Sequence, residues 1–242
     1  MLSVKPWRAE AVARLFLGLF TSICFGALLV TWLSPKEAES KSGGITFLAL
    51  AVSTLTFHGV GLVLIRQLLW EHDIGWRSAF GLKRAHLARA LWWSALVGLA
   101  APPLASLLGG AWGHVLTWFH WKPVAQSAVQ LLQQHQNAPN YQTLVIGVLA
   151  IFIAPVIEEM LFRGVLYPCI KQAGYPGVAL WGTSLFFAAT HANMATLVPL
   201  MVFAMVLTWL YEKFDNLAAP MIAHSLFNLA NFCYMVFLTG DK

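Results

Sequence analysis

The sequence predicts an all-α fold, a polytopic transmembrane bundle of seven to eight helices. Hydrophobic residues make up 59% of the 242 residues and charged residues only 10%, whereas a typical soluble domain carries about 25% charged residues. The apolar residues also gather in long runs, and about 20 of them in a row cross the hydrocarbon core of a bilayer. Because so few charges could not cover a soluble surface, soluble, disordered and nucleic-acid-binding classes are excluded. We therefore expect no nucleic-acid partner.

The first two apolar runs predict two membrane-spanning helices. Leu15–Leu33 is uncharged and lies between Arg14 and Lys36, and Ile45–Ile65 is interrupted only by His58. The first run is longer than the roughly 7–15 apolar residues usual in a secretory signal, so we expect it to be retained. Both runs are expected to be helical because unpaired backbone groups in lipid cost several kcal/mol each.

Five further runs complete the expected bundle. Ala90–Trp112 contains two consecutive prolines, and the Trp-rich stretch 111–121 could form an eighth helix. Thr143–Ile170 passes a proline and meets two adjacent glutamates within an otherwise apolar stretch. The remaining expected spans are Tyr175–Thr190, which ends at a histidine, then Ala195–Tyr211 and Leu217–Leu238.

We expect one integral membrane domain in two parts, with N-terminal helices in residues 1–142 and motif-bearing helices in residues 143–242. The stretch 121–142 is rich in glutamine and its apolar residues recur at helical spacing, which predicts a short amphipathic helix at the membrane surface. An excess of lysine and arginine marks the cytoplasmic side, so we expect a cytoplasmic amino terminus. The brevity of the chain leads us to expect a prokaryotic inner membrane. The basic residues on that side are Lys5, Arg8, Arg14, Arg66, Arg77, Lys83, Arg84, Arg89, Lys171 and Lys213, against Lys36, Lys41, Lys122 and Lys242 on the other.

Ionisable side chains within the apolar spans mark a candidate site, because such groups are costly in lipid. In Glu158-Glu159-Met160-Leu161-Phe162-Arg163, residues four apart share one face of a helix, so Glu159 is expected to pair with Arg163. Glu158 points about 100° away from Glu159 and has no local counter-charge. The spacing predicts a structural role for Glu159 and a reactive one for Glu158.

Two more pairs at the same spacing add hydrogen-bonding groups. Phe187 and His191 lie one turn apart, as do His224 and Asn228. The second pair could direct two donors at one point, which a developing oxyanion requires. A glutamate, a histidine and a donor pair that converge between helices would suit water-mediated acyl hydrolysis.

Other polar residues receive simpler interpretations. We expect His58 to be a packed, hydrogen-bonded core histidine. Ser225 is a poor nucleophile candidate because it diverges from the adjacent His224 on a helix. The cysteines have neither disulfide nor metal-ligand spacing; they are Cys24, Cys169 and Cys233.

The candidate residues are expected at different depths in the membrane. At 1.5 Å per residue, His191 falls about 24 Å from Tyr175, near the far end of its span. Glu158 and Asn228 fall nearer the middle of theirs. A kink, a tilt or a shifted helix boundary could reconcile them.

The three motifs resemble those of the CPBP family of intramembrane proteases, which includes CAAX-processing Ras-converting enzymes and bacteriocin-processing proteins. The resemblance covers roughly residues 144–231 and implies an eight-helix bundle with its site in an intramembrane cavity. The matching motifs, in order, are Glu158-Glu159-x-x-x-Arg163, Phe187-x-x-x-His191 and His224-x-x-x-Asn228.

The same resemblance implies the role of each residue. Glu158 would be the general base that activates water, and His191 would hold that water or protonate the leaving amine. His224 and Asn228 would form the oxyanion hole. The supporting residues would be Glu159, Arg163 and Phe187.

The resemblance implies a glutamate-type protease without a cofactor. Zinc is the alternative, since two histidines and a carboxylate can bind it, although the chain lacks the H-E-x-x-H pattern. The expected partners are membrane lipids and a peptide or protein substrate, lipidated or with a C-terminal membrane segment. A CAAX-type tail, a leader peptide and a C-terminal sorting signal all remain open as substrates.

Two other classes of function stay open. A non-catalytic membrane regulator would bind a signalling partner, but it would not need Glu158, His191, His224 and Asn228 together. A proton-coupled transporter would use buried glutamate and histidine as a relay. The chain shows no internal repeat, which many transporters have.

Overall fold

A computed structural model of the chain describes residues 2–33, 47–82, 87–121 and 141–238. Every regular element in these ranges is helical, which confirms the all-α prediction. The helices are α1 (Ala9–Leu33), α3 (Phe47–Thr54), α4 (Val60–Glu71), α5 (Trp76–Ala79), α6 (Leu87–Trp118), α8 (Tyr141–Val148), α9 (Ala154–Glu159), α10 (Tyr167–Gln172), α11 (Pro176–Thr190), α12 (Leu197–Phe214) and α13 (Ala218–Cys233).

Short segments of wider or tighter helix join several of these elements. One of them is a 3-10 turn, η4 (Met194–Thr196). The others are π-helical and make α3–α4, α8–α10 and α13 continue as longer rods: η1 (Leu55–Gly59), η2 (Leu149–Ile153), η3 (Met160–Leu166) and η5 (Tyr234–Leu238). Such π turns occur often at functional sites, because they redirect side chains and free a carbonyl.

Five rods are long and apolar enough to cross a membrane, so the integral membrane class is supported. They are Ala9–Leu33, Leu48–Glu71, Ala88–Trp118, Thr143–Gln172 and Met194–Phe214. The stretch 111–121 does not form a separate eighth helix, since α6 continues through it to Trp118. The amphipathic helix predicted within 121–142 falls on residues 122–140, which lie outside the described part of the chain.

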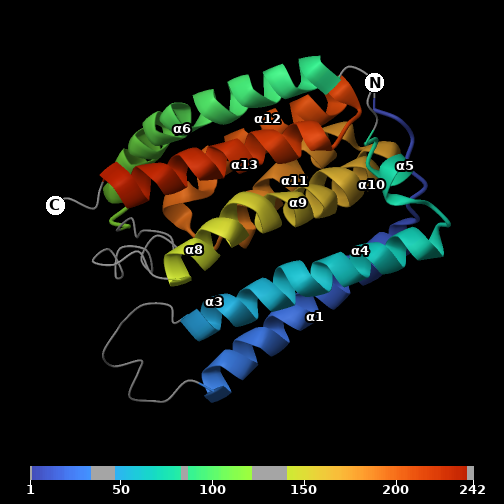
Figure 1. Cartoon of the computed structure of the whole chain (residues 1–242), viewed down its shortest axis with the longest axis horizontal. Helices are drawn as coiled ribbons and strands as arrows, with labels where there is room; N and C mark the ends of the chain where they lie inside the picture. The colour runs from blue at the N-terminus through green and yellow to red at the C-terminus, as the bar shows by residue number, and fades with distance from the viewer. Residues whose placement is uncertain (1, 34–46, 83–86, 122–140, 239–242) are drawn as a thin grey trace.

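The rods run roughly parallel or antiparallel to one another (Figure 1). The pair formed by α1 and the α3–α4 rod lies on one side, and α6 and α13 lie on the other. The α8–α10 rod runs between these two groups and contacts α13 on one side and the α3–α4 rod on the other. The α8–α10 rod, which carries Glu158, Glu159 and Arg163, is therefore called the central rod.

Close helix packing places α13, which carries His224 and Asn228, against α6. A Cβ atom on Gly98 of α6 would lie 2.7 Å from the carbonyl oxygen of Ala223. Only glycine allows the two backbones to approach so closely. This contact fixes the position of α13 and therefore that of His224 and Asn228.

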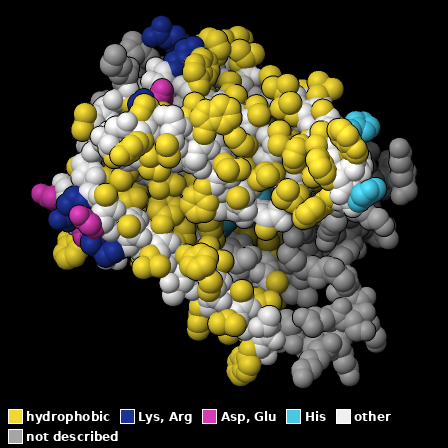
Figure 2. Space-filling model, turned by 180° about the vertical axis from the view of Figure 1, so that it is seen from behind, with side chains coloured by type: hydrophobic (Ala, Val, Ile, Leu, Met, Phe, Trp, Pro, Cys, Tyr) yellow, Lys and Arg dark blue, Asp and Glu magenta, His cyan; other side chains and the backbone are white. Residues whose placement is uncertain are grey.

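The face of the bundle seen in Figure 2 is largely apolar. Large side chains such as Leu17, Phe20, Trp92 and Leu107 are exposed on α1 and α6. An apolar surface of this extent would be unstable in water, whereas lipid chains cover it without cost. The buried interior in contrast holds a charged pair, Glu159 and Arg163.

Charged side chains gather at the end of the bundle where the amino terminus lies. Arg14 pairs with Glu71 at 2.8 Å, and Lys171 pairs with Glu212. Lys5 lies 3.8 Å from Asp215 at the end of α12. Three of the basic residues that the sequence assigned to one side, Lys5, Arg14 and Lys171, thus share one end.

Candidate active site

The buried ion pair predicted from the sequence is present. Arg163 donates from Nη1 to Oε1 of Glu159 at 2.8 Å, one helical turn apart, and both side chains are almost fully buried. Arg163 also donates from Nη2 to the carbonyl oxygen of Ala204 at 3.0 Å, and its guanidinium lies 4.5 Å from the ring of Phe187. The pair therefore ties the central rod to α12 and α11.

Glu158 points to a different group of partners, as its helical angle predicts. Its carboxylate is 13% exposed, and its two oxygens face two imidazoles. Oε1 lies 3.4 Å from Nε2 of His58, and Oε2 lies 3.9 Å from Nε2 of His224. The adjacent glutamates thus differ in environment, with an arginine beside Glu159 and only histidines within ion-pair distance of Glu158 among the described residues.

His224 connects the two glutamates. Its Nδ1 donates to Oε1 of Glu159 at 2.9 Å, while its Nε2 faces Glu158. The rings of Phe187 and Phe203 hold the imidazole from two sides, each with its centroid 5.7 Å away. In a neutral imidazole only one nitrogen carries a hydrogen. Because Nδ1 carries it and donates it to the hydrogen bond with Glu159, Nε2 can donate only in a ring that holds a second proton.

His191 reaches the same depth because α11 is short. It follows directly after α11, which has 15 residues and a length of about 22 Å. A similar length of chain, through η3 and α10, separates Glu158 from Gln172, and a short turn joins α10 to α11. The two helices therefore bring both residues to similar depths, which removes the mismatch expected from the sequence.

One nitrogen of the His191 imidazole forms a hydrogen bond within the protein. Nδ1 donates to the carbonyl oxygen of Phe187 at 3.0 Å, and the ring lies 5.1 Å from the ring of Phe187. His191 also interacts electrostatically with Glu158. Its Nε2 would then be free of the proton in the neutral ring and could accept a hydrogen bond from water.

Asn228 makes a contact that the sequence did not predict. Its Nδ2 donates to the carbonyl oxygen of Ala150 at 2.7 Å, in the π-helical segment η2. One amide hydrogen is therefore used to hold α13 against the central rod. A carboxamide has two such hydrogens, so the oxyanion role that the resemblance implies would depend on the second.

His58 lies in the site rather than only in the apolar core, which differs from our expectation. It is 100 residues from Glu158 in sequence, yet their side chains are in contact. A helix-spacing pattern reports only neighbours within one or two turns, so it could not reveal this pair. The available signal was a titratable residue interrupting an apolar span.

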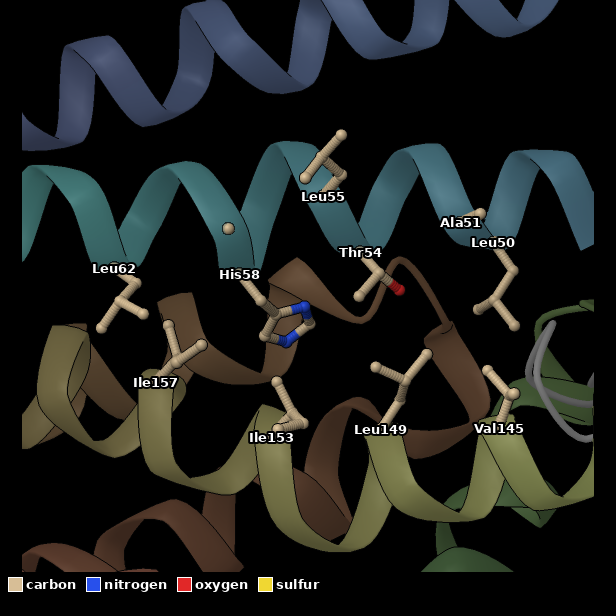
Figure 3. Close-up of a pocket in the computed structure, with 11 residues that line it drawn as sticks. Leu50, Ala51, Thr54, Leu55, His58, Leu62, Val145, Leu149, Ile153 and Ile157 are labelled. Carbon is tan, nitrogen blue, oxygen red and sulfur yellow. The ribbon is translucent and has the colours of Figure 1, made fainter.

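An apolar groove of about 510 Å³ lies beside these residues, between the α3–α4 rod and the α8–α9 part of the central rod (Figure 3). Its walls are aliphatic except for Thr54 and His58. The imidazole of His58 points across the groove toward the central rod, between Ile153 and Ile157. His58 thus lies both in the wall of the groove and beside Glu158.

Histidines and carboxylates in one cluster are the residue types that bind zinc. Among the described residues, no group of three or more histidines, cysteines, aspartates or glutamates has an arrangement that could hold a metal ion. Glu158 lies between His58 and His224, whose contacts are 3.4 and 3.9 Å.

Comparisons with known proteins agree with the motifs. Residues 140–230 match the family model described as type II CAAX prenyl endopeptidase Rce1-like. UPF0177 protein YxdF of Lactococcus lactis subsp. lactis (strain IL1403) is 33% identical over 78 residues, which cover 32% of this chain and 42% of that relative. The match thus spans less than half of the relative's length. No solved structure gives a significant match. The resemblance that the three motifs indicate is therefore confirmed over residues 140–230, which are similar to the Rce1-like type II CAAX prenyl endopeptidase family.

Proposed function

We propose that the chain is an intramembrane endopeptidase in which Glu158 activates the water that attacks a peptide carbonyl. The observation that carries the proposal is the environment of Glu158. Its two oxygens face imidazoles from two different helices at 3.4 and 3.9 Å, next to a second glutamate that is already paired with Arg163. A carboxylate that is partly exposed and not neutralised by arginine is free to take a proton.

The chemistry would proceed in two steps. Glu158 takes a proton from water while the water oxygen bonds to the carbonyl carbon, and the carbonyl oxygen becomes negative. A hydrogen on Nε2 of His224 and the second amide hydrogen of Asn228 would stabilise that oxygen, a contribution of about 10²–10³ in rate per donor. The carbon–nitrogen bond then breaks, and a proton from Glu158, assisted by His191, goes to the leaving amine.

The groove indicates the class of substrate. Its aliphatic lining would suit a lipid-modified or membrane-embedded segment, and His58 in its wall contacts Glu158. We propose that the substrate is a CAAX-type tail, a leader peptide or a C-terminal sorting signal. We also propose a cytoplasmic amino terminus in a prokaryotic inner membrane, supported by the basic residues at that end.

The function can be tested without knowing the substrate. Membranes and culture medium from cells that produce the wild-type chain or Glu158→Gln would be compared by mass spectrometry of protein carboxyl termini. We expect a set of new termini that appears only with the wild-type chain. Identical termini in both samples, together with a phenotype that survives Glu158→Gln, would instead support a non-catalytic membrane regulator.

We propose that cleavage needs no metal ion. The purified protein in liposomes would be treated with EDTA and with 1,10-phenanthroline, and cleavage of a peptide identified by the comparison of termini would be followed. We expect the rate to stay unchanged, because the proposed water activation uses the carboxylate alone. Loss of the rate with both chelators, and its recovery with added zinc, would establish the zinc-dependent alternative.

A further inference from the structure

His58 belongs to a helix that carries none of the three motifs. It lies in η1, a π-helical turn between α3 and α4. The carbonyl oxygen of Thr56 in this turn accepts a hydrogen bond from Ser22 of α1 at 3.1 Å. The turn is thus held by a neighbouring helix, and a π turn in an otherwise regular rod commonly marks a functional position.

The tautomer of His58 follows from its partner. An ionised carboxylate only accepts hydrogen bonds, so Nε2 of His58 must carry the hydrogen that faces Oε1 of Glu158. The distance of 3.4 Å is at the long end for a hydrogen bond, and the pair can tighten when substrate enters. The other nitrogen, Nδ1, is buried and has no hydrogen-bond partner among the described residues.

Packing alone would not favour a histidine at position 58. A buried nitrogen without a partner costs free energy, and an aliphatic side chain would match the other residues of the groove. Among the described residues, His58 gains an edge contact with the ring of Phe57, which an aliphatic side chain could replace by packing, and the Nε2–Oε1 contact, which it could not. It restrains one oxygen of Glu158, while the other oxygen stays directed at His224.

We propose that His58 is a positioning residue for the hydrolysis described above, and the inference rests on that proposed function. Its Nε2–H holds Oε1 of Glu158, so that Oε2 keeps the orientation in which it takes the proton from water. His58 would act through Glu158 and would not itself react with the substrate. A displacement of a reacting group by about 1 Å can cost about 10²-fold in rate.

Two amide replacements test this role because they differ mainly in reach. Glutamine places an N–H close to the position of Nε2, whereas the asparagine side chain is one methylene shorter and cannot reach Glu158. The rates of His58→Gln and His58→Asn would be measured in liposomes on a synthetic peptide that spans the most abundant Glu158-dependent cleavage site. We expect His58→Gln to keep kcat within about tenfold of wild type and His58→Asn to lose about 10²-fold, each with little change in KM.

Leu62→Ala provides the matched control. Leu62 lines the same groove from the α3–α4 rod, one turn after His58, and its aliphatic side chain cannot form a hydrogen bond. We expect this variant to raise KM, because it alters the apolar lining of the proposed substrate groove. The comparison separates a loss of groove shape from a loss of the bond to Glu158.

The outcomes distinguish the inference from the proposed function. Equal kcat values for His58→Gln and His58→Asn would overturn the positioning role, whether both are active or both impaired. Termini that persist with Glu158→Gln would overturn the proposed function itself. If Glu158→Gln removes the termini and the two His58 variants do not differ, only the inference about His58 fails.

Discussion

Replacing Glu158 with glutamine is expected to lower kcat by about 10²–10⁴-fold, the usual contribution of a general base. The amide has nearly the same shape as the carboxylate, but it cannot take a proton from water. Because Glu158 is partly exposed and lacks an arginine partner among the described residues, the free energy of unfolding should change little. Turnover in liposomes and thermal unfolding in detergent would measure the two effects separately.

Glu212→Gln is a suitable control for this variant. Glu212 also lies in a membrane-spanning rod and is partly exposed, but it accepts hydrogen bonds from Tyr167 and Lys171 at the charged end of the bundle. We expect its kcat to equal that of wild type. A Glu158→Gln protein that turns over as fast as the Glu212→Gln protein would assign water activation to another group.

The fold was largely predictable because lipid imposes a simple rule on the sequence. Each of the seven apolar runs corresponds to a helix, although their ends differ. For example, α1 starts at Ala9 rather than Leu15 because the helix continues through Glu10 and Arg14 beyond the apolar run. Hydropathy detects only the part of a helix that lies in lipid. The backbone hydrogen bonds of the helix continue beyond that part, into the polar residues at its end.

The site was predictable only where its partners lie on one helix. The pair formed by Glu159 and Arg163 follows from the spacing of four residues, and the structure confirms it. The bond from Asn228 to the backbone of Ala150 joins residues 78 apart in the chain. Contacts of this kind depend on how helices pack and on where π turns occur, and neither property has a short-range signature in a single sequence.

Replacing Arg163 with methionine is expected to destabilise the protein by about 3–5 kcal/mol, the usual cost of removing one partner of a buried ion pair. Methionine fills much of the same volume, but it leaves Glu159 with a buried charge and only His224 as a hydrogen-bond donor among the described residues. It also removes the bond to the carbonyl of Ala204. Unfolding in detergent, followed by circular dichroism, would measure the loss.

Arg14→Met gives the matched comparison. Arg14 also pairs with a glutamate, Glu71, at 2.8 Å, the same distance as between Arg163 and Glu159. The Arg14 side chain is however 61% exposed, so water and salt screen the pair and its removal should hardly change stability. Equal losses from both variants would contradict the importance of burial for the Glu159–Arg163 pair. A loss confined to Arg163→Met would show that burial makes this pair a major contributor to the stability of the bundle, since the two pairs have the same length and differ in exposure.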